Sequence, residues 1–174
     1  MRTEGWILGC DPDSVKSGFA LLNCATRSFE FVGALSFPEA IKFMDGLAAS
    51  DEYKGIILVM EDSNTSTNWH LNYLVREPMD TMKKLRIAAA TGRNVGKCHA
   101  TADHLQEYAE SVGIEVRLQK PLVKCWKGKD RKITQEEITS FISGLPNRMN
   151  QECRDSVLLS WTAADFPIRI SMRR

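Results

Sequence analysis

The chain has 174 residues, of which 43% are hydrophobic and 26% are charged, a composition typical of a globular protein with a substantial core. Its formal net charge of +1 excludes a general polycation, so any nucleic-acid binding must come from a local basic patch. No apolar run approaches the roughly 20 residues of a membrane span, and an apolar run begins within a few residues of Met1, so we expect one cytoplasmic domain over residues 1–174.

The stretch 6–23, WILGCDPDSVKSGFALLN, predicts two strands joined by a polar turn, with Asp11 at the end of the first strand. A carboxylate at the end of a buried strand is costly unless it is paired or binds a metal ion. Taken alone, an aspartate followed by Pro12 is better explained by turn formation. The role of Asp11 therefore has to be judged from the rest of the chain.

Residues 28–35 predict a third strand, and residues 38–49 predict an amphipathic helix that covers one face of the meander. The run 55–60 is apolar without alternation, which is typical of a strand buried on both faces, and it ends on Glu61. Ligand sites in open α/β sheets lie at the carboxyl ends of the strands. Asp11 and Glu61 are therefore expected to face each other.

The segment 78–113 is predicted to be helical, with a break around 91–94, and residues 115–118 predict a fifth strand. Residues 134–143 predict a short helix with Thr134 as N-cap and Glu137 in its capping box. The last helix is expected to begin near Asn150, with Glu152 and Asp155 on one face of its first two turns. Complementarity to the helix dipole alone is an alternative explanation for these two acids.

Residues 120–132 combine six basic side chains with one acid and with Trp126. In isolation such a run is equally well explained as a solvated loop. Four acids gathered at one place are costly, and bound divalent cations are the usual remedy. Hard carboxylate oxygens suit Mg²⁺ or Mn²⁺, and two such ions can promote phosphodiester hydrolysis. Beside such acids, phosphate binding is the better interpretation of the basic run.

Cysteine and histidine do not point to a metal site of another kind. The cysteines lack the spacing of a zinc site or a disulfide framework, which favours a reducing compartment; they are Cys10, Cys24, Cys98, Cys125 and Cys153. His70, His99 and His104 have no organised partners in the sequence, and the predicted site leaves them out.

The chain resembles the RuvC-type Holliday junction resolvases of the ribonuclease H-like superfamily. The resemblance rests on GCDPDSVKSGFALLN, VMED, RKITQEEITSFISGLP and NQECRDSVLLSW, which follow one another in the family's order. It implies an α/β fold in which helices flank a mixed five-stranded sheet, an antiparallel meander plus parallel strands. It also implies a homodimer that nicks four-way DNA junctions in recombination or repair, with two Mg²⁺ ions per subunit, for which Mn²⁺ can substitute.

By position in the family's motifs, Asp11 would bridge the two ions, Glu61 would bind one, and Glu152 with Asp155 would complete the site. Lys132 lies 23 residues before Asp155 and matches a lysine that contacts the scissile phosphate, with Lys129 as the runner-up. The other residues expected to bind DNA are Lys124, Lys127, Arg131 and Trp69, the last as an aromatic inserted into the junction. The sequence departs from the family where Asp13 replaces a frequent glycine and where Glu152 replaces Asp or His.

Three alternatives remain open at this point. Another ribonuclease H-like nuclease would act on RNA–DNA hybrids, flaps or phage DNA ends, and the acids alone do not separate these substrates. A non-catalytic junction-binding module would have no use for clustered negative charge. A sugar-kinase or actin-like ATPase fold would need a second domain and a glycine-rich phosphate loop, and the sequence has neither.

Overall fold

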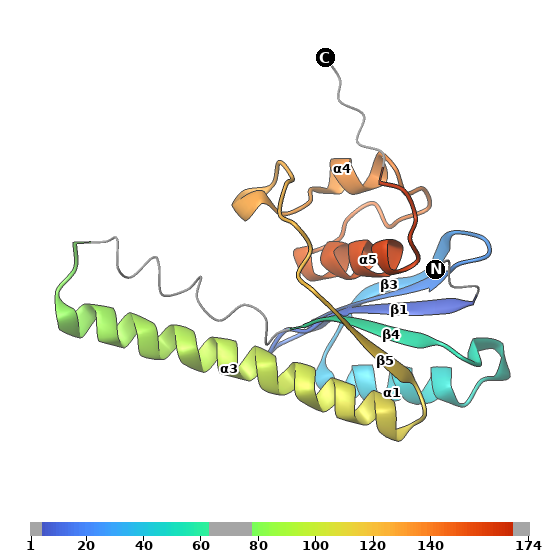
Figure 1. Cartoon of the computed structure of the whole chain (residues 1–174), viewed down its shortest axis with the longest axis horizontal. Coiled ribbons are helices and arrows are strands. Elements are labelled where there is room, and N and C mark those ends of the chain that lie inside the picture. Colours follow the sequence, from blue (N-terminus) through green and yellow to red (C-terminus); the bar gives the residue numbers. More distant parts are fainter. Residues whose placement is uncertain (1–4, 63–77, 169–174) are drawn as a thin grey trace, which may run out of the picture.

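The computed structural model describes residues 5–62 and 78–168. Their five strands form one mixed sheet in the order β3-β2-β1-β4-β5, with helices on both faces (Figure 1). The meander consists of β1 (Trp6–Asp11), β2 (Ser17–Asn23) and β3 (Ser28–Leu35), which pair antiparallel. Strand β4 (Ile57–Glu61) pairs parallel with β1, and β5 (Glu115–Gln119) pairs parallel with β4. The predicted mixed sheet is confirmed.

The central strands are apolar on both faces because each face carries its own core. On β1, Ile7 contributes to the core on one side and Leu8 to the core on the other. On β4, Ile57 and Leu58 alternate in the same way. Successive side chains of a strand point to opposite faces, so an unbroken apolar run requires two covering layers.

One covering layer consists of α5 (Gln151–Ala163) and α4 (Gln135–Thr139), and the other of α1 (Phe37–Ala48) and α3 (Thr81–Ser111) (Figure 1). The α1 helix begins where its sequence predicts, since Pro38 lies in its first turn and Ser36 forms a capping box with Glu39. No helix in the described ranges is both long and apolar enough to cross a bilayer.

The predicted break at residues 91–94 is wrong, because α3 is one helix of 31 residues. Thr91 and Gly92 each lower helix propensity by no more than about 1 kcal/mol, and no proline interrupts the segment. The Asp80 side chain caps the start of the helix by accepting a hydrogen bond from the Lys83 backbone at 3.0 Å. The C-terminal half packs into the core, while the N-terminal half extends well beyond the sheet (Figure 1).

The short helix α4 carries the predicted capping box of Thr134 and Glu137, but it ends at Thr139 and not at Ser143. The hydroxyls of Thr139 and Ser140 donate to backbone carbonyls three or four residues earlier, which gives the backbone an alternative to continued helix. The last helix begins as predicted, after Asn150 caps it through a hydrogen bond from the Cys153 backbone at 2.9 Å.

Candidate active site

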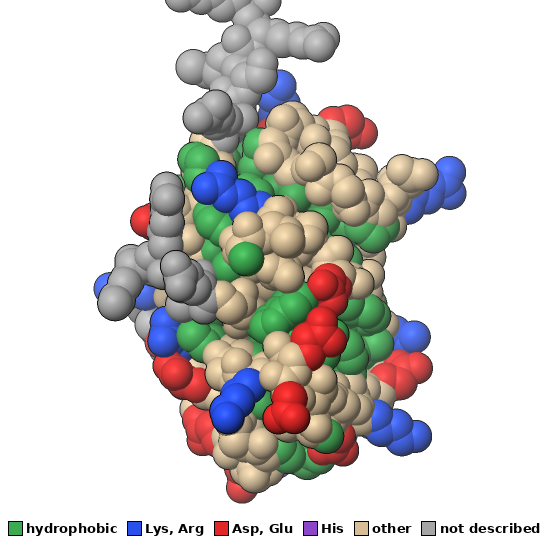
Figure 2. Space-filling view, turned by 90° about the vertical axis from the view of Figure 1, so that its right-hand side faces the viewer, with side chains coloured by type: hydrophobic (Ala, Val, Ile, Leu, Met, Phe, Trp, Pro, Cys, Tyr) green, Lys and Arg blue, Asp and Glu red, His purple; other side chains and the backbone are tan. Residues whose placement is uncertain are grey.

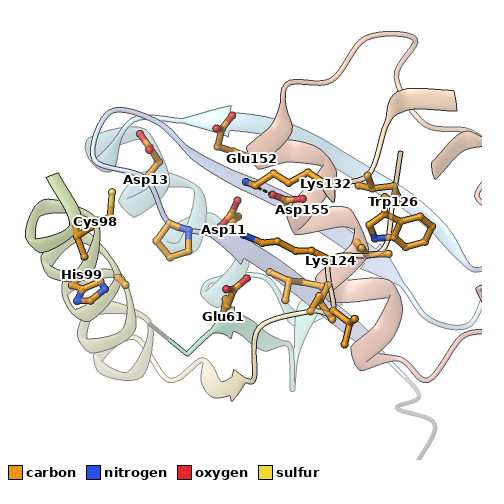
Figure 3. Close-up of a pocket in the computed structure, with 18 residues that line it drawn as sticks. Asp11, Asp13, Glu61, Cys98, His99, Lys124, Trp126, Lys132, Glu152 and Asp155 are labelled. Atoms are coloured by element: carbon orange, nitrogen blue, oxygen red, sulfur yellow. Dashed lines mark hydrogen bonds and ion pairs between the residues drawn. The ribbon is translucent and has the colours of Figure 1, made fainter. Parts of the chain in front are cut away.

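A cavity of about 410 Å³ opens at the carboxyl ends of β1 and β4 (Figure 3). The structure places all four predicted acids in its lining, together with two lysines of the basic run: Asp11, Glu61, Glu152, Asp155, Lys124 and Lys132. The acids come from two strands and one helix that are far apart in the sequence. Tertiary folding therefore concentrates carboxylates and ammonium groups in one place.

Strand pairing brings the first two acids together. Cys10 of β1 pairs with Met60 of the parallel strand β4, so Asp11 and Glu61 follow directly at the same sheet edge. The residues before them are fully buried, which fixes the direction of both strands up to the point where the carboxylates emerge. The predicted meeting of these two acids is thus a consequence of parallel register.

Two glycines let α5 bring the other two acids over the same edge. A Cβ atom built on Gly9 would overlap the carbonyl oxygen of Ser156, and one built on Gly18 would overlap that of Glu152. The helix therefore lies directly on the backbone of β1 and β2. Ser156 is small and buried, and its hydroxyl is satisfied within the helix by donating to the carbonyl of Cys153 at 2.9 Å.

Both oxygens of Asp155 are engaged. Lys132 Nζ donates to Oδ2 at 2.9 Å, and Gln151 Nε2 donates to Oδ1 at 2.8 Å. The Lys132 and Asp155 side chains are 35% and 21% exposed, so their ion pair is partly shielded from water. The pair holds an ammonium group directly beside the other carboxylates (Figure 3).

Arg154 ties the start of α5 to the segment that carries the lysine. Its Nε donates to the carbonyl of Ile133 at 3.1 Å, and its Nη2 donates to Gln151 Oε1 at 2.8 Å. A further hydrogen bond joins Nη1 to the carbonyl of Met149. Because Ile133 directly follows Lys132, this guanidinium fixes the backbone from which the lysine reaches the cavity.

The carboxylates raise one another's pKa values. The pKa of Asp11 rises to about 8, first because the group is buried and then because Asp155 lies nearby, and Lys132 opposes the rise. Burial and the charge of Asp155 also raise the pKa of Glu61, and Lys124 opposes this rise. Burial acts to lower the pKa of Lys132, but its hydrogen bond to Asp155 and the surrounding negative charge outweigh that effect and raise it.

The donor chemistry of the cavity fits a hard divalent cation. All four acids offer carboxylate oxygens, which Mg²⁺ and Mn²⁺ prefer, and burial and the neighbouring acids raise the pKa of Asp11, an effect that a nearby cation would oppose. Within residues 5–62 and 78–168, no three Asp, Glu, His or Cys side chains are grouped closely enough to hold an ion as they stand. Coordination of one ion would require the carboxylates to draw closer together.

The basic run divides into a part that enters the cavity and a part that does not. Lys124, Trp126 and Lys132 line it, and Trp126 also stacks on Phe141 with ring centroids 6.1 Å apart. The remaining predicted DNA contacts are exposed on the turn before Lys132 and are absent from the lining: Lys127, Lys129 and Arg131. Trp69 lies outside the described residues.

Two features of this site escaped the sequence analysis. Cys98 and His99 of α3 line the cavity opposite Glu152 and Asp155, although no sequence pattern points to His99 (Figure 3). Gln151 lies one helical turn before Asp155, and this spacing is the signal that identifies it as a partner. The wall formed by α3 has no comparable local signal because it depends on tertiary packing.

No protein-family model matches the chain, and comparison with curated proteins also found no match. Among solved structures, the chain is similar to RuvC of T. thermophilus in complex with a Holliday junction substrate, with a TM-score of 0.53 and 10% sequence identity. The match covers 92% of this chain and 93% of the other. Sheet order, covering helices and this match agree, and they confirm the resemblance at the level of structure: the chain has a ribonuclease H-like α/β fold similar to that of RuvC.

Proposed function

We propose that the protein is a metal-dependent endonuclease that resolves four-way DNA junctions by paired nicks in recombination or repair. The observation that carries this proposal is the meeting of four carboxylates and Lys132 in one cavity of a ribonuclease H-like sheet. A buried cluster of this kind costs stability, and such costs are typical of sites that bind ligands or carry out chemistry. The similarity to RuvC, which was solved with a Holliday junction, directs the choice of substrate toward branched DNA.

Asp11, Glu61, Glu152 and Asp155 are the residues that would hold two divalent ions per subunit, Mg²⁺ or Mn²⁺. Such ions, when bound, supply an activated water and charge stabilisation for the leaving oxygen of a phosphodiester. Asp11 interacts electrostatically with all three other acids, since Asp155, Glu61 and Glu152 each raise its pKa. This position suits the residue that serves both ions.

Lys132 has a second role in this proposal. Its ammonium group pairs with Asp155 at 2.9 Å, so it neutralises part of the negative charge of the site. With Asp155 holding a divalent ion, the ammonium group of Lys132 would be free to contact the scissile phosphate. There it stabilises the charge that develops in the transition state. Lys124, which lines the same cavity, is placed to contact an adjacent phosphate.

The exposed turn before Lys132 extends this contact away from the cavity. Its side chains, Lys127, Lys129 and Arg131, would bind the DNA backbone without reading its sequence. Trp69 is proposed as the aromatic residue that enters the junction.

A homodimer would supply the second of the two paired nicks. One face of α3 carries small and apolar side chains at alternating spacings of three and four residues: Met82, Leu85, Ala89, Gly92 and Gly96. Met82 and Leu85 are 59% and 57% exposed, and the two glycines have open space around them. We propose this set as the dimer face.

Light scattering should show a dimer that Leu85→Glu converts to monomer. A monomeric wild type at micromolar concentration would contradict the proposed dimer.

The decisive experiment incubates the protein with labelled four-way, flap, RNA–DNA hybrid and linear substrates in Mg²⁺ or EDTA. We expect symmetric nicks in the four-way junction only, abolished by EDTA. Asp11→Asn should lose cleavage by at least about a thousandfold while it retains junction binding. Cleavage of hybrids or flaps in preference to junctions would keep the nuclease but overturn the junction assignment. Tight junction binding without any cleavage by the wild type would favour a non-catalytic module.

A further inference from the structure

The charges of α3 are segregated along its length. Residues 81–102 contain five basic side chains and no acid, namely Lys83, Lys84, Arg86, Arg93 and Lys97. The last nine residues of the helix contain three acids and no lysine or arginine, namely Asp103, Glu107 and Glu110. The boundary between the two signs falls where the helix begins to pack into the core through Ala102, Leu105 and Ala109. The basic half is therefore the projecting half.

Four of these basic residues form one line on the helix. Their spacings of three, seven and four residues place Lys83, Arg86, Arg93 and Lys97 within about 80° of rotation around the axis. All four are exposed, and the line lies about a third of a turn from the buried residues of the same helix. We call these four residues the basic stripe.

The basic stripe begins level with the candidate active site along α3, but on the side of the helix turned away from the cavity. Val95, Cys98 and His99 line the cavity, and helical spacing turns Lys97 away from each of them by about 100° to 160°. From there the helix continues past the edge of the sheet to Thr81 (Figure 1). Lys83 and Lys97 are 14 residues apart, which corresponds to about 21 Å along a helix, or about six base pairs of duplex DNA.

The basic stripe concentrates positive charge in one place, although the formal net charge of the whole molecule is only +1. The side of the molecule away from the projecting half of α3 shows basic and acidic side chains next to one another (Figure 2). None of the three ion pairs found in the described part of the chain involves a residue of the stripe. Within residues 5–62 and 78–168, the cations of the stripe thus form no ion pair with an acid.

We infer that the basic stripe binds the phosphate backbone of one duplex arm of the DNA outside the active site. The inference rests on the proposed function in that it takes branched DNA as the substrate. Four cations in a line fit a run of phosphates on one side of a duplex, and a helix surface of this kind contacts the backbone without reading bases. An arm shorter than about six base pairs would fail to reach the far end of the stripe.

The test measures binding and not cleavage, so it is independent of catalysis. Fluorescence anisotropy in EDTA compares the full-length wild type with the double variant Lys83→Gln/Arg86→Gln, which removes the far end of the stripe. The DNA is a four-way junction with hairpin-capped arms of either 4 or 12 base pairs. On long arms the variant should bind about tenfold more weakly near 0.1 M salt, and the slope of log affinity against log salt should fall by about 2.

A matched control removes two exposed lysines far from the stripe, Lys42→Gln/Lys54→Gln, and should bind like the wild type. On short arms the wild type and the stripe variant should bind equally. Equal affinity on long arms, or an equal loss on both arm lengths, would overturn the stripe proposal while leaving the nuclease proposal intact. A wild type that binds no branched DNA at all would overturn both.

Discussion

The two faces of the sheet are packed differently. One face positions candidate catalytic side chains, and the other carries a helix that extends past the sheet. On one face α5 lies against the strand backbones at Gly9 and Gly18, and this contact holds Glu152 and Asp155 over the sheet edge. On the other face α1 and α3 pack through larger side chains such as Met44 and Leu105, and α3 continues past the sheet. Tight packing fixes reactive groups, whereas a projecting helix presents an exposed surface.

The first test concerns the sheet face that carries the candidate catalytic groups, where the effect on cleavage is expected to be large. Lys132→Met should lower the cleavage rate about 100- to 1000-fold at saturating DNA, because the charge aimed at the scissile phosphate is lost. Single-turnover kinetics on a four-way junction in Mg²⁺ would measure the effect. Lys42→Met, an exposed lysine on α1, is the control and should cleave at the wild-type rate. Equal rates in both variants would remove Lys132 from the mechanism.

Packing on the α5 face provides the next test. Gly18→Ala should lower the free energy of unfolding by about 2 kcal/mol, because the new methyl group collides with the backbone at Glu152. Gly46→Ala, in α1 on the opposite face, has open space and should raise stability by up to about 1 kcal/mol. Urea denaturation followed by circular dichroism compares the two. Similar stability changes would mean that α5 is not held by close backbone contact.

Removal of the buried charge at Asp11 should stabilise the metal-free protein. The folded-state pKa of about 8 lies above the unfolded value near 3.8, so the folded protein retains a proton that the unfolded chain releases between these pH values. Wild-type stability in EDTA should therefore decline as the pH rises from about 4 to about 8. Asp11→Asn lacks this decline and should be more stable by about 1 to 2 kcal/mol at pH 8.

Thermal denaturation over this pH range would measure the effect of the Asp11 substitution. Addition of Mg²⁺ should raise the melting temperature of the wild type and leave that of Asp11→Asn nearly unchanged. A wild type whose stability rises between pH 4 and pH 8 in EDTA would contradict the predicted loss of stability when the Asp11 carboxyl group ionises.

The smallest expected effect concerns the support of Asp155. Gln151→Leu removes the hydrogen bond to Oδ1 and should weaken Mn²⁺ binding about tenfold, which calorimetry can measure without DNA. The chain contains a matched pair on α3, where Gln106 donates to Glu110 at 2.9 Å with the same spacing of four residues. Gln106→Leu should leave the affinity for Mn²⁺ unchanged. A loss in both variants would indicate a general effect of helix stability.

The sequence predicts the framework of this molecule because its signals are local. Apolar runs that end on Asp11 and Glu61, and the capping box at Thr134, each specify an element without knowledge of its neighbours. The continuity of α3 through Gly92 was missed, since glycine weakens a helix without forbidding it. The contribution of His99 was missed because only packing between distant elements places it at the cavity.

The order of charges along α3 has one more consequence, for the motion of the helix itself. Apart from the N-cap Asp80, the first turn of α3 carries lysines and no acid, and the last turn carries Glu110 and no base. The charges within both turns therefore oppose the helix macrodipole. The projecting half also lacks the core contacts that stabilise the other half, so its amide hydrogens should exchange quickly in a monomer free of DNA. A polyanion laid along that half would reverse the unfavourable electrostatics and slow the exchange.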